Sequence, residues 1–164
     1  MRRASVFLVA AALLLALSAG VALAQNFIGT SGPDIIAGTD KADFIDGKGG
    51  NDQLFGLDGR DTTLGRAGDD LIEGGRGPDR LTGGPDNDTI YGGGGNDAVN
   101  GGPGDDTIIV SDDGTGPDSA DQYACGDGED TVYVRSADHS TLEDEQNCEH
   151  RLPPKDAPPA PPVP

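Results

Sequence analysis

A period of nine residues runs without interruption from Gly29 to Ile109, and it constrains the fold more than any other feature of the chain. In that register the segment divides into GTSGPDIIA, GTDKADFID, GKGGNDQLF, GLDGRDTTL, GRAGDDLIE, GGRGPDRLT, GGPDNDTIY, GGGGNDAVN and GGPGDDTII. Position one is glycine and position six is aspartate in every copy. A flexible linker has no reason to keep such a phase, so the pattern predicts a repeat architecture.

Position eight supplies the apolar part of the pattern, with Thr63 as its exception. The apolar residues there are Ile36, Ile45, Leu54, Ile72, Leu81, Ile90, Val99 and Ile108. One apolar residue per nine suits a very short strand that points one side chain inward and follows a six-residue turn. We expect glycine at positions one and four to supply the positive φ angles of that turn, and asparagine at position five (Asn51, Asn87, Asn96) to tolerate the same conformation.

One copy buries too little apolar surface to be stable, so the copies are expected to stack, two per coil, into a parallel solenoid. Position-six carboxylates then recur every eighteen residues along one edge, about 4.8 Å apart. Their repulsion is reversed if a hard divalent cation binds between the layers to carboxylates and loop carbonyls. Calcium fits best, because magnesium prefers a stricter octahedron and transition metals prefer His or Cys, which the repeats lack.

The copies GGRGPDRLT, GGGGNDAVN and GGPGDDTII match the pattern GGxGxDxUx, and the segment resembles the hemolysin-type (RTX) calcium-binding nonapeptide repeats. The resemblance implies an all-β fold, a parallel β-roll (β-solenoid) of nine repeats. It also implies that position-six aspartates and loop carbonyls of successive same-side copies bind Ca²⁺. The implied metal ligands are Asp34, Asp43, Asp52, Asp61, Asp70, Asp79, Asp88, Asp97 and Asp106. Copies one and two depart from the pattern because they lack the paired glycines, and Lys41 and Asp86 replace the glycine at position four.

The first 24 residues have the features of a secretory signal peptide. Arg2 and Arg3 precede an apolar stretch, and the sequence Ala-Leu-Ala at residues 22–24 forms a cleavage site. An uncleaved membrane anchor is the alternative, because the apolar stretch approaches spanning length. With residues 25–28 as a short lead-in, we expect a secreted, extracellular protein without stable membrane insertion after cleavage. This leader departs from the C-terminal, uncleaved export signal that the RTX resemblance implies.

The register breaks over residues 110–124, which we interpret as an irregular acidic insertion, and returns once as CGDGEDTVY. Residues 125–151 are expected to form this degenerate repeat and a C-terminal cap that is closed by a disulfide between Cys125 and Cys148. A zinc site from these cysteines with His139 and His150 is the alternative, although their spacing matches no compact zinc motif. Residues 152–164 are proline-rich and are expected to form an extended disordered tail.

Composition indicates a chain that cannot fold on hydrophobic burial alone. The net charge is −18, only 4% of the residues are aromatic, and 27 of the 164 are glycine. The calcium-free chain is therefore expected to lie close to the disordered class. Such a charge also argues against nucleic acid as a partner.

The leading functional hypothesis is a secreted calcium-binding β-roll with a structural or adhesive role and no enzymatic activity. Its expected partners are calcium ions and a cell-surface polymer or protein. The alternative is a calcium-dependent extracellular hydrolase or an accessory module of one, because RTX repeats often follow such a domain. The motifs GxSxG and HExxH are absent, and the pair Ser136 and His139 is expected to be solvated surface.

Bulky apolar residues recur at the outward positions seven and nine. They are Ile35, Phe44, Phe55, Leu64, Leu71, Tyr91 and Ile109. This scatter fits a strip that binds a partner, and it also fits strand-favouring residues on a fold with little interior.

Overall fold

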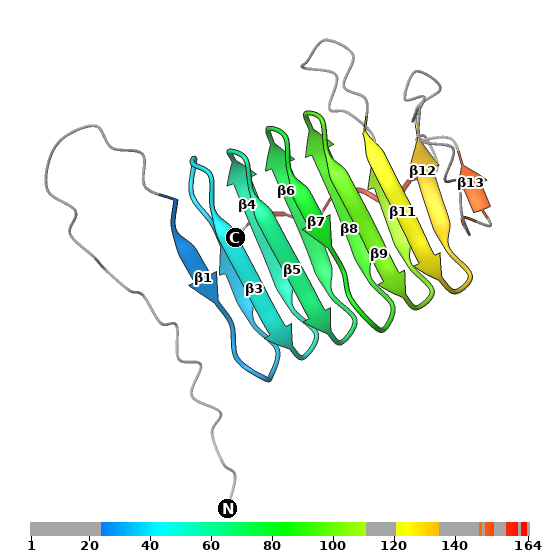
Figure 1. The fold of residues 1–164 in the computed structure, drawn as a ribbon, viewed down its shortest axis with the longest axis horizontal. Coiled ribbons are helices and arrows are strands. Elements are labelled where there is room, and N and C mark those ends of the chain that lie inside the picture. Colours follow the sequence, from blue (N-terminus) through cyan, green and yellow to red (C-terminus); the bar gives the residue numbers. More distant parts are fainter. Residues whose placement is uncertain are drawn as a thin grey trace, which may run out of the picture.

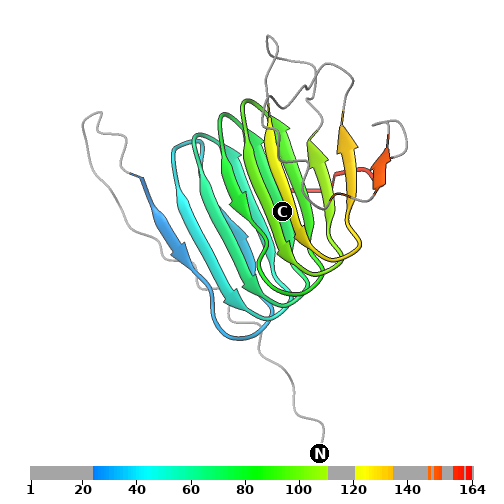
Figure 2. The same ribbon diagram turned by 45° about the vertical axis from the view of Figure 1, so that its right-hand side comes forward.

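The chain forms two parallel β-sheets that wind into a β-solenoid of about five turns (Figures 1 and 2). The structure is a computed structural model that describes residues 24–110, 121–134, 148, 150–152, 157–160 and 162–163. Strands and turns account for these residues, and none of them belongs to a helix that could cross a membrane. The expectation of an all-β, parallel β-roll is confirmed. Residues 1–23 of the expected signal peptide and residues 111–120 of the expected insertion lie outside the described residues.

Consecutive strands alternate between the two sheets. The six-stranded sheet contains β1 (Asn26–Ile28), β3 (Phe44–Gly49), β5 (Thr62–Ala67), β7 (Arg80–Thr82), β9 (Ala98–Pro103) and β11 (Gln122–Asp127). The seven-stranded sheet contains β2 (Ile35–Ala37), β4 (Gln53–Asp58), β6 (Leu71–Arg76), β8 (Thr89–Gly94), β10 (Thr107–Val110), β12 (Thr131–Val134) and β13 (His150–Leu152).

The strand register follows the eighteen-residue period. In the seven-stranded sheet, Ile72 lies beside Ile90 and Ile90 lies beside Ile108. After β10 the offset between neighbouring strands increases, so that Val99 lies beside Tyr123. Strand β11 begins at Gln122, within the segment 110–124 that the sequence marks as irregular, so the solenoid continues before the motif CGDGEDTVY begins.

The core is a single column of side chains between the sheets. Position-eight residues such as Ile45, Leu54 and Ile90 have no exposed surface. Thr63 occupies the same column and is equally buried, and its hydroxyl oxygen has no hydrogen-bond partner. Because each turn of the solenoid adds only two such side chains, burial of apolar surface is a modest source of stability.

The turns place their strained backbone at positions two and four. Positive φ angles occur there, for example 100° at Gly75 and 116° at Gly77. The expectation of positive φ at the position-one glycines and at the position-five asparagines is wrong, because none of these residues has it. Position one needs glycine for a different reason: a Cβ at Gly74 would lie 2.7 Å from Oδ2 of Asp79.

Three early turns carry a larger residue at position two in the left-handed conformation. They are Lys48 (φ 74°), Leu57 (φ 82°) and Arg66 (φ 85°). Each costs about 1–2 kcal/mol relative to glycine. The early turns are therefore more strained than the later ones, in which Gly75, Gly84 and further glycines occupy position two.

A disulfide closes the C-terminal end. Cys125 at the fourth residue of β11 is bonded to Cys148, with their Cα atoms 5.5 Å apart, and β13 pairs in parallel with β12. The expected bond is confirmed, and a zinc site on these cysteines is wrong because both thiols are used in the disulfide. The remaining cap residues, 135–147 and 149, lie outside the described part of the chain.

Position-four glycines provide a test of this stacking. We expect Gly77→Ala to lower the free energy of unfolding by at least about 2 kcal/mol, because φ is positive and a Cβ would collide with the Gly59 carbonyl of the previous turn. Gly32→Ala is the matched control, since Gly32 also occupies position four but a Cβ there meets no atom within 4 Å. Denaturant unfolding in calcium measures both, and equal losses would contradict the stacked turns.

Candidate metal centre

The position-six aspartates lie in the turns along the two edges of the solenoid. Turns that lead from the six-stranded to the seven-stranded sheet form the first edge, and turns that lead back form the second edge. The first edge carries Asp34, Asp52, Asp70, Asp88 and Asp106, and the second edge carries Asp43, Asp61, Asp79 and Asp97. From Asp43 onward each is at most 4% exposed, so the structure buries a row of carboxyl groups at each edge.

One oxygen of each interior carboxyl group joins neighbouring turns. The backbone N–H of each position-six aspartate donates to Oδ1 of the next aspartate on the same edge, at 2.7–2.9 Å. Asp61, for example, donates to Asp79, and Asp79 donates to Asp97. These bonds fix the orientation of every carboxyl group in the row.

The second oxygen, Oδ2, is buried and accepts no hydrogen bond at six of these positions. They are Asp52, Asp61, Asp70, Asp79, Asp88 and Asp106. A buried carboxylate oxygen without a partner is costly unless a cation or a proton compensates it. Because the missing hydrogen-bond partner recurs in successive turns, we infer that these Oδ2 atoms line a ligand-binding site.

Each Oδ2 faces a cradle of backbone. It lies above the position-one glycine of its own turn, and the position-one carbonyl of the next turn on that edge lies beside the same glycine. At Gly74 these neighbours are Oδ2 of Asp79 and the carbonyl oxygen of Gly92. A side chain at position one would fill this space, so the glycine keeps carboxylate and carbonyl oxygens close together.

Position-four carbonyls offer further oxygens. In the described turns, carbonyls at positions one, three, six and nine accept hydrogen bonds from backbone N–H groups, and no backbone N–H donates to a position-four carbonyl. The Gly59 carbonyl instead approaches the position-four glycine of the next turn, Gly77. Each edge thus combines one buried carboxylate oxygen per turn with carbonyl oxygens.

This donor set fits calcium. Nowhere in the described residues do three His, Cys, Asp or Glu side chains converge as a cage, so an ion here would need backbone carbonyls in its shell. Calcium accepts six to eight oxygen ligands, with carbonyls among them, in flexible geometry. When bound, it would neutralise the buried carboxylates and supply the missing partner of each Oδ2.

Burial dominates the electrostatics of the row. Desolvation raises the pKa of Asp79 to about 7 and the pKa of Asp88 to about 8, and repulsion from Asp70 and Asp106 adds to the shift at Asp88. The pKa values of Asp61, Asp70 and Asp106 rise to about 6 for the same main reason. Without a cation, burial therefore makes each of these carboxyl groups easier to protonate in the folded state than in the unfolded chain.

In the two N-terminal turns, protein donors supply the hydrogen bonds that Oδ2 lacks at the six positions above. Oδ2 of Asp34 accepts hydrogen bonds from both N–H and Oγ1 of Thr30, at 2.6 and 3.0 Å. Oδ2 of Asp43 is bound in the same manner by Thr39, at 2.6 and 2.8 Å. Among the nine copies, only these first two have threonine at position two. Asp34 and Asp43 therefore have protein donors at Oδ2, whereas the six aspartates named above have none.

The structure adds two residues to the nine aspartates expected from the sequence. Asp121 and Asp130 continue the two rows, since they accept the backbone N–H groups of Asp97 and Asp106 at 2.9 and 2.8 Å. Both are almost fully buried. The spacing from Asp97 to Asp121 is 24 residues instead of eighteen, so the break in period hid Asp121. Asp130 stood in place within CGDGEDTVY and could have been found.

A second ladder runs along the first edge at position five. Asp69 N–H donates to Oδ1 of Asn51, Asn87 N–H to Asp69, Asp105 N–H to Asn87 and Glu129 N–H to Asp105. Asn51 and Asn87 therefore bridge turns through their side chains, and no position-five asparagine is in the left-handed conformation. Asp69 and Asp105 also place additional negative charge beside the first row of carboxylates.

The pKa shifts predict how pH affects the calcium-free chain. A carboxyl group whose pKa is higher in the folded state destabilises that state as pH rises from the unfolded value near 4 to the folded value. With folded values of about 6 to 8, stability without calcium should fall between pH 4 and pH 8. We expect more β-signal in circular dichroism with chelator at pH 5.5 than at pH 8. A β-signal that increases with pH under chelator would contradict the burial of these groups.

Comparison with known proteins agrees with this geometry. The family model of the RTX calcium-binding nonapeptide repeat (4 copies) matches residues 28–63, 64–99 and 74–108. No curated protein and no solved structure shows significant similarity to the chain. The matched residues include the turns of both edges from Asp34 to Asp106. Residues 28–108 of the chain therefore belong to the family of RTX calcium-binding nonapeptide repeats.

Proposed function

We propose that this protein is a secreted β-roll with a structural or adhesive role, and that calcium ions bound along both edges fold it outside the cell. The observation that carries the proposal is the buried and unpartnered Oδ2 atom that recurs at six position-six aspartates. Asp52, Asp70, Asp88 and Asp106 are the proposed ligands of the first edge, and Asp61 and Asp79 are those of the second edge. Asp97 lies in the same row as Asp79 and is proposed to act with it.

Calcium and folding are linked because the ion acts only on the stacked state. The cradle at each position-one glycine combines atoms of two turns that lie eighteen residues apart, so an unfolded chain lacks it. A ligand that binds only the folded state stabilises it by mass action. The thin core and the net charge of −18 leave little other stabilisation for the calcium-free solenoid.

An extracellular location supports this coupling. The disulfide between Cys125 and Cys148 fits an oxidising compartment. Extracellular calcium modules bind with dissociation constants of about 10⁻⁴ to 10⁻³ M, close to the calcium concentration outside cells. A chain that stays unfolded until export would then acquire its rigid form where calcium is available.

A calcium titration tests whether the ion folds the chain. Calcium titration of the chelator-treated full chain at pH 8 should convert a largely disordered circular dichroism spectrum into a β-spectrum, because the cation compensates the buried carboxylates. Magnesium at equal concentration is the control and should have a much smaller effect, because it keeps its water. A β-spectrum that does not change on addition of chelator would contradict the proposal.

A second prediction distinguishes ligands from structural aspartates. Asp79→Asn keeps an Oδ1 acceptor for Asp61 N–H but removes the charge, so we expect severalfold more calcium to reach the folding midpoint and a lower cooperativity. The same change should increase residual structure under chelator, because it removes a buried charge. Asp34→Asn is the matched control, since Thr30 already binds its Oδ2, and it should shift the midpoint little. Equal shifts in the two variants would rule out shared interior sites.

A further inference from the structure

Aromatic and aliphatic side chains, interrupted by the half-buried Glu73, form a column on the outer face of the seven-stranded sheet. Position-nine residues lie side by side across neighbouring strands in the order Phe55, Glu73, Tyr91, Ile109 and Tyr133. Phe55 is 1%, Ile109 4% and Tyr91 8% exposed, although position nine points away from the core. On the opposite sheet Ile28, also at position nine, is 50% exposed. The burial of Phe55 and Tyr91 therefore needs a covering element.

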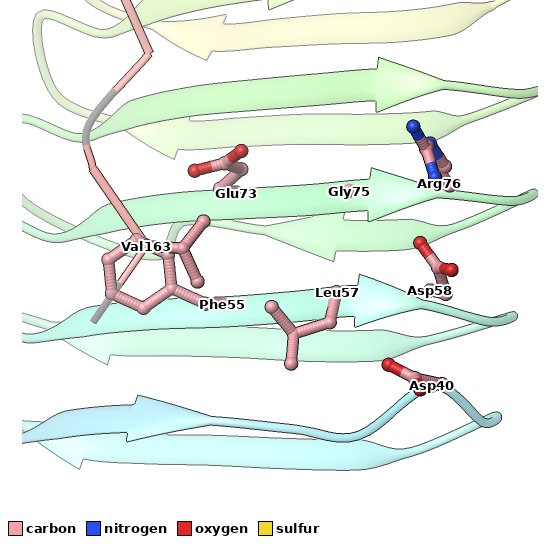
Figure 3. A pocket seen from close by; sticks show the side chains of 8 residues that line it. All are labelled: Asp40, Phe55, Leu57, Asp58, Glu73, Gly75, Arg76 and Val163. Atoms are coloured by element: carbon pink, nitrogen blue, oxygen red, sulfur yellow. The ribbon is translucent and has the colours of Figure 1, made fainter.

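The proline-rich C-terminal segment lies on this column. Tyr91 Oη donates a hydrogen bond of 3.1 Å to the carbonyl oxygen of Pro159. Figure 3 shows the Val163 side chain over the ring of Phe55, with Glu73 on the neighbouring strand. A pocket of about 240 Å³ beside this contact is lined by Val163, Phe55, Leu57 and Arg76, among others. Pro159 thus contacts β8 through Tyr91 and Val163 lies at Phe55 on β4, so the segment crosses the strands of this sheet.

The dimensions fit an extended segment that crosses the strands. Tyr91 on β8 and Phe55 on β4 are two strand spacings apart, about 9.6 Å. The four residue steps from Pro159 to Val163 would span about 12 Å in a polyproline II helix. One extended segment therefore reaches both contacts.

The chemistry of the segment also fits the column. Five of the eight residues from 157 to 164 are proline, so the segment lacks most N–H groups and cannot pair as a strand. Its carbonyl groups are not used internally, and grooves lined by aromatic residues bind such chains through hydrophobic contact and donors like a tyrosine hydroxyl. The segment after residue 156 carries no charged side chain, so the acidic solenoid does not repel it.

We propose that the outer face of the seven-stranded sheet is a binding groove for proline-rich chain, and that the C-terminal segment of the same molecule occupies it as a strap across the turns. The strap joins β4, β6 and β8 without using the calcium edges. It therefore adds a second, ion-independent connection along the solenoid axis and covers an aromatic surface that would otherwise be exposed. This inference does not depend on the proposed function.

Nuclear magnetic resonance of the calcium-loaded full chain tests the contact directly. We expect nuclear Overhauser effects between the Val163 methyl groups and the Phe55 ring. An equimolar mixture of isotope-labelled and unlabelled chains should show this contact within one chain only. Absence of the contact, or its presence only between different chains, would overturn the proposal.

Variants of the full chain test the energetics. Val163→Asp changes only the strap and leaves the core side chains unchanged. It should abolish the contact and increase the quenching of tyrosine fluorescence by acrylamide. This fluorescence can be read directly because the chain has three tyrosines and no tryptophan. Tyr91→Phe removes one hydrogen bond, so it should lower the ratio of docked to undocked strap roughly fivefold. Leu64→Ala, at position nine of the opposite sheet, is the matched control and should leave the contact intact.

A synthetic peptide of residues 153–164 completes the test. Added to the Val163→Asp chain, it should bind in a saturable manner and restore the protection of the tyrosines. Failure of the peptide to bind, or unchanged quenching in Val163→Asp, would overturn the groove.

Discussion

The structure depends on a row of carboxyl groups whose two oxygens have different roles. Oδ1 accepts the backbone N–H of the preceding turn and holds the stack in register. Oδ2 points into a cradle of glycine and carbonyl groups and accepts no hydrogen bond at six positions from Asp52 to Asp106. The hydrogen-bonded ladder therefore forces carboxylates into close, buried proximity, and this energetic conflict is removed by a proton or a cation. Under the proposed function, stability and calcium binding are consequently one property of the same residues.

Other features of the chain follow from this constraint. Glycine at position one keeps the space at Oδ2 open, and glycine at position four lets the carbonyl of one turn approach the next, as at Gly77. The column of position-eight residues is thin because each strand is short and shares its turn with the carboxylate. A larger core would make the fold independent of the ion, whereas the present one leaves the carboxyl groups to decide whether the solenoid forms.

The two ends and one face of the solenoid are stabilised by interactions other than metal binding. Thr30 and Thr39 supply hydrogen bonds to the first two carboxyl groups, so the N-terminal turns do not share the need of the interior. Cys125 and Cys148 tie the C-terminal end together through a covalent bond. The proline-rich segment contacts Tyr91 and Phe55 on the outer face. Each of these devices acts without a metal ion and limits the unravelling of a stack whose turns contact only their neighbours.

The sequence by itself determined the parallel solenoid, its eighteen-residue register, the inward column and the rows of aspartates, because all of these repeat with one period and a period fixes which residues lie above one another. It also indicated the disulfide, since two cysteines in a chain that is expected to be exported most simply pair with each other. Other features became apparent only from the tertiary structure, because the nine-residue period does not specify them. Positive φ angles occur at positions two and four and not at position one. Position one is glycine because a Cβ there would collide with a carboxylate oxygen. Asp121 joins the row although it follows Asp97 by 24 residues instead of eighteen, a spacing that the period does not predict. The column from Phe55 to Tyr133 and its proline-rich cover depend on contacts between residues up to 108 positions apart, as between Phe55 and Val163, and no local pattern specifies such a contact.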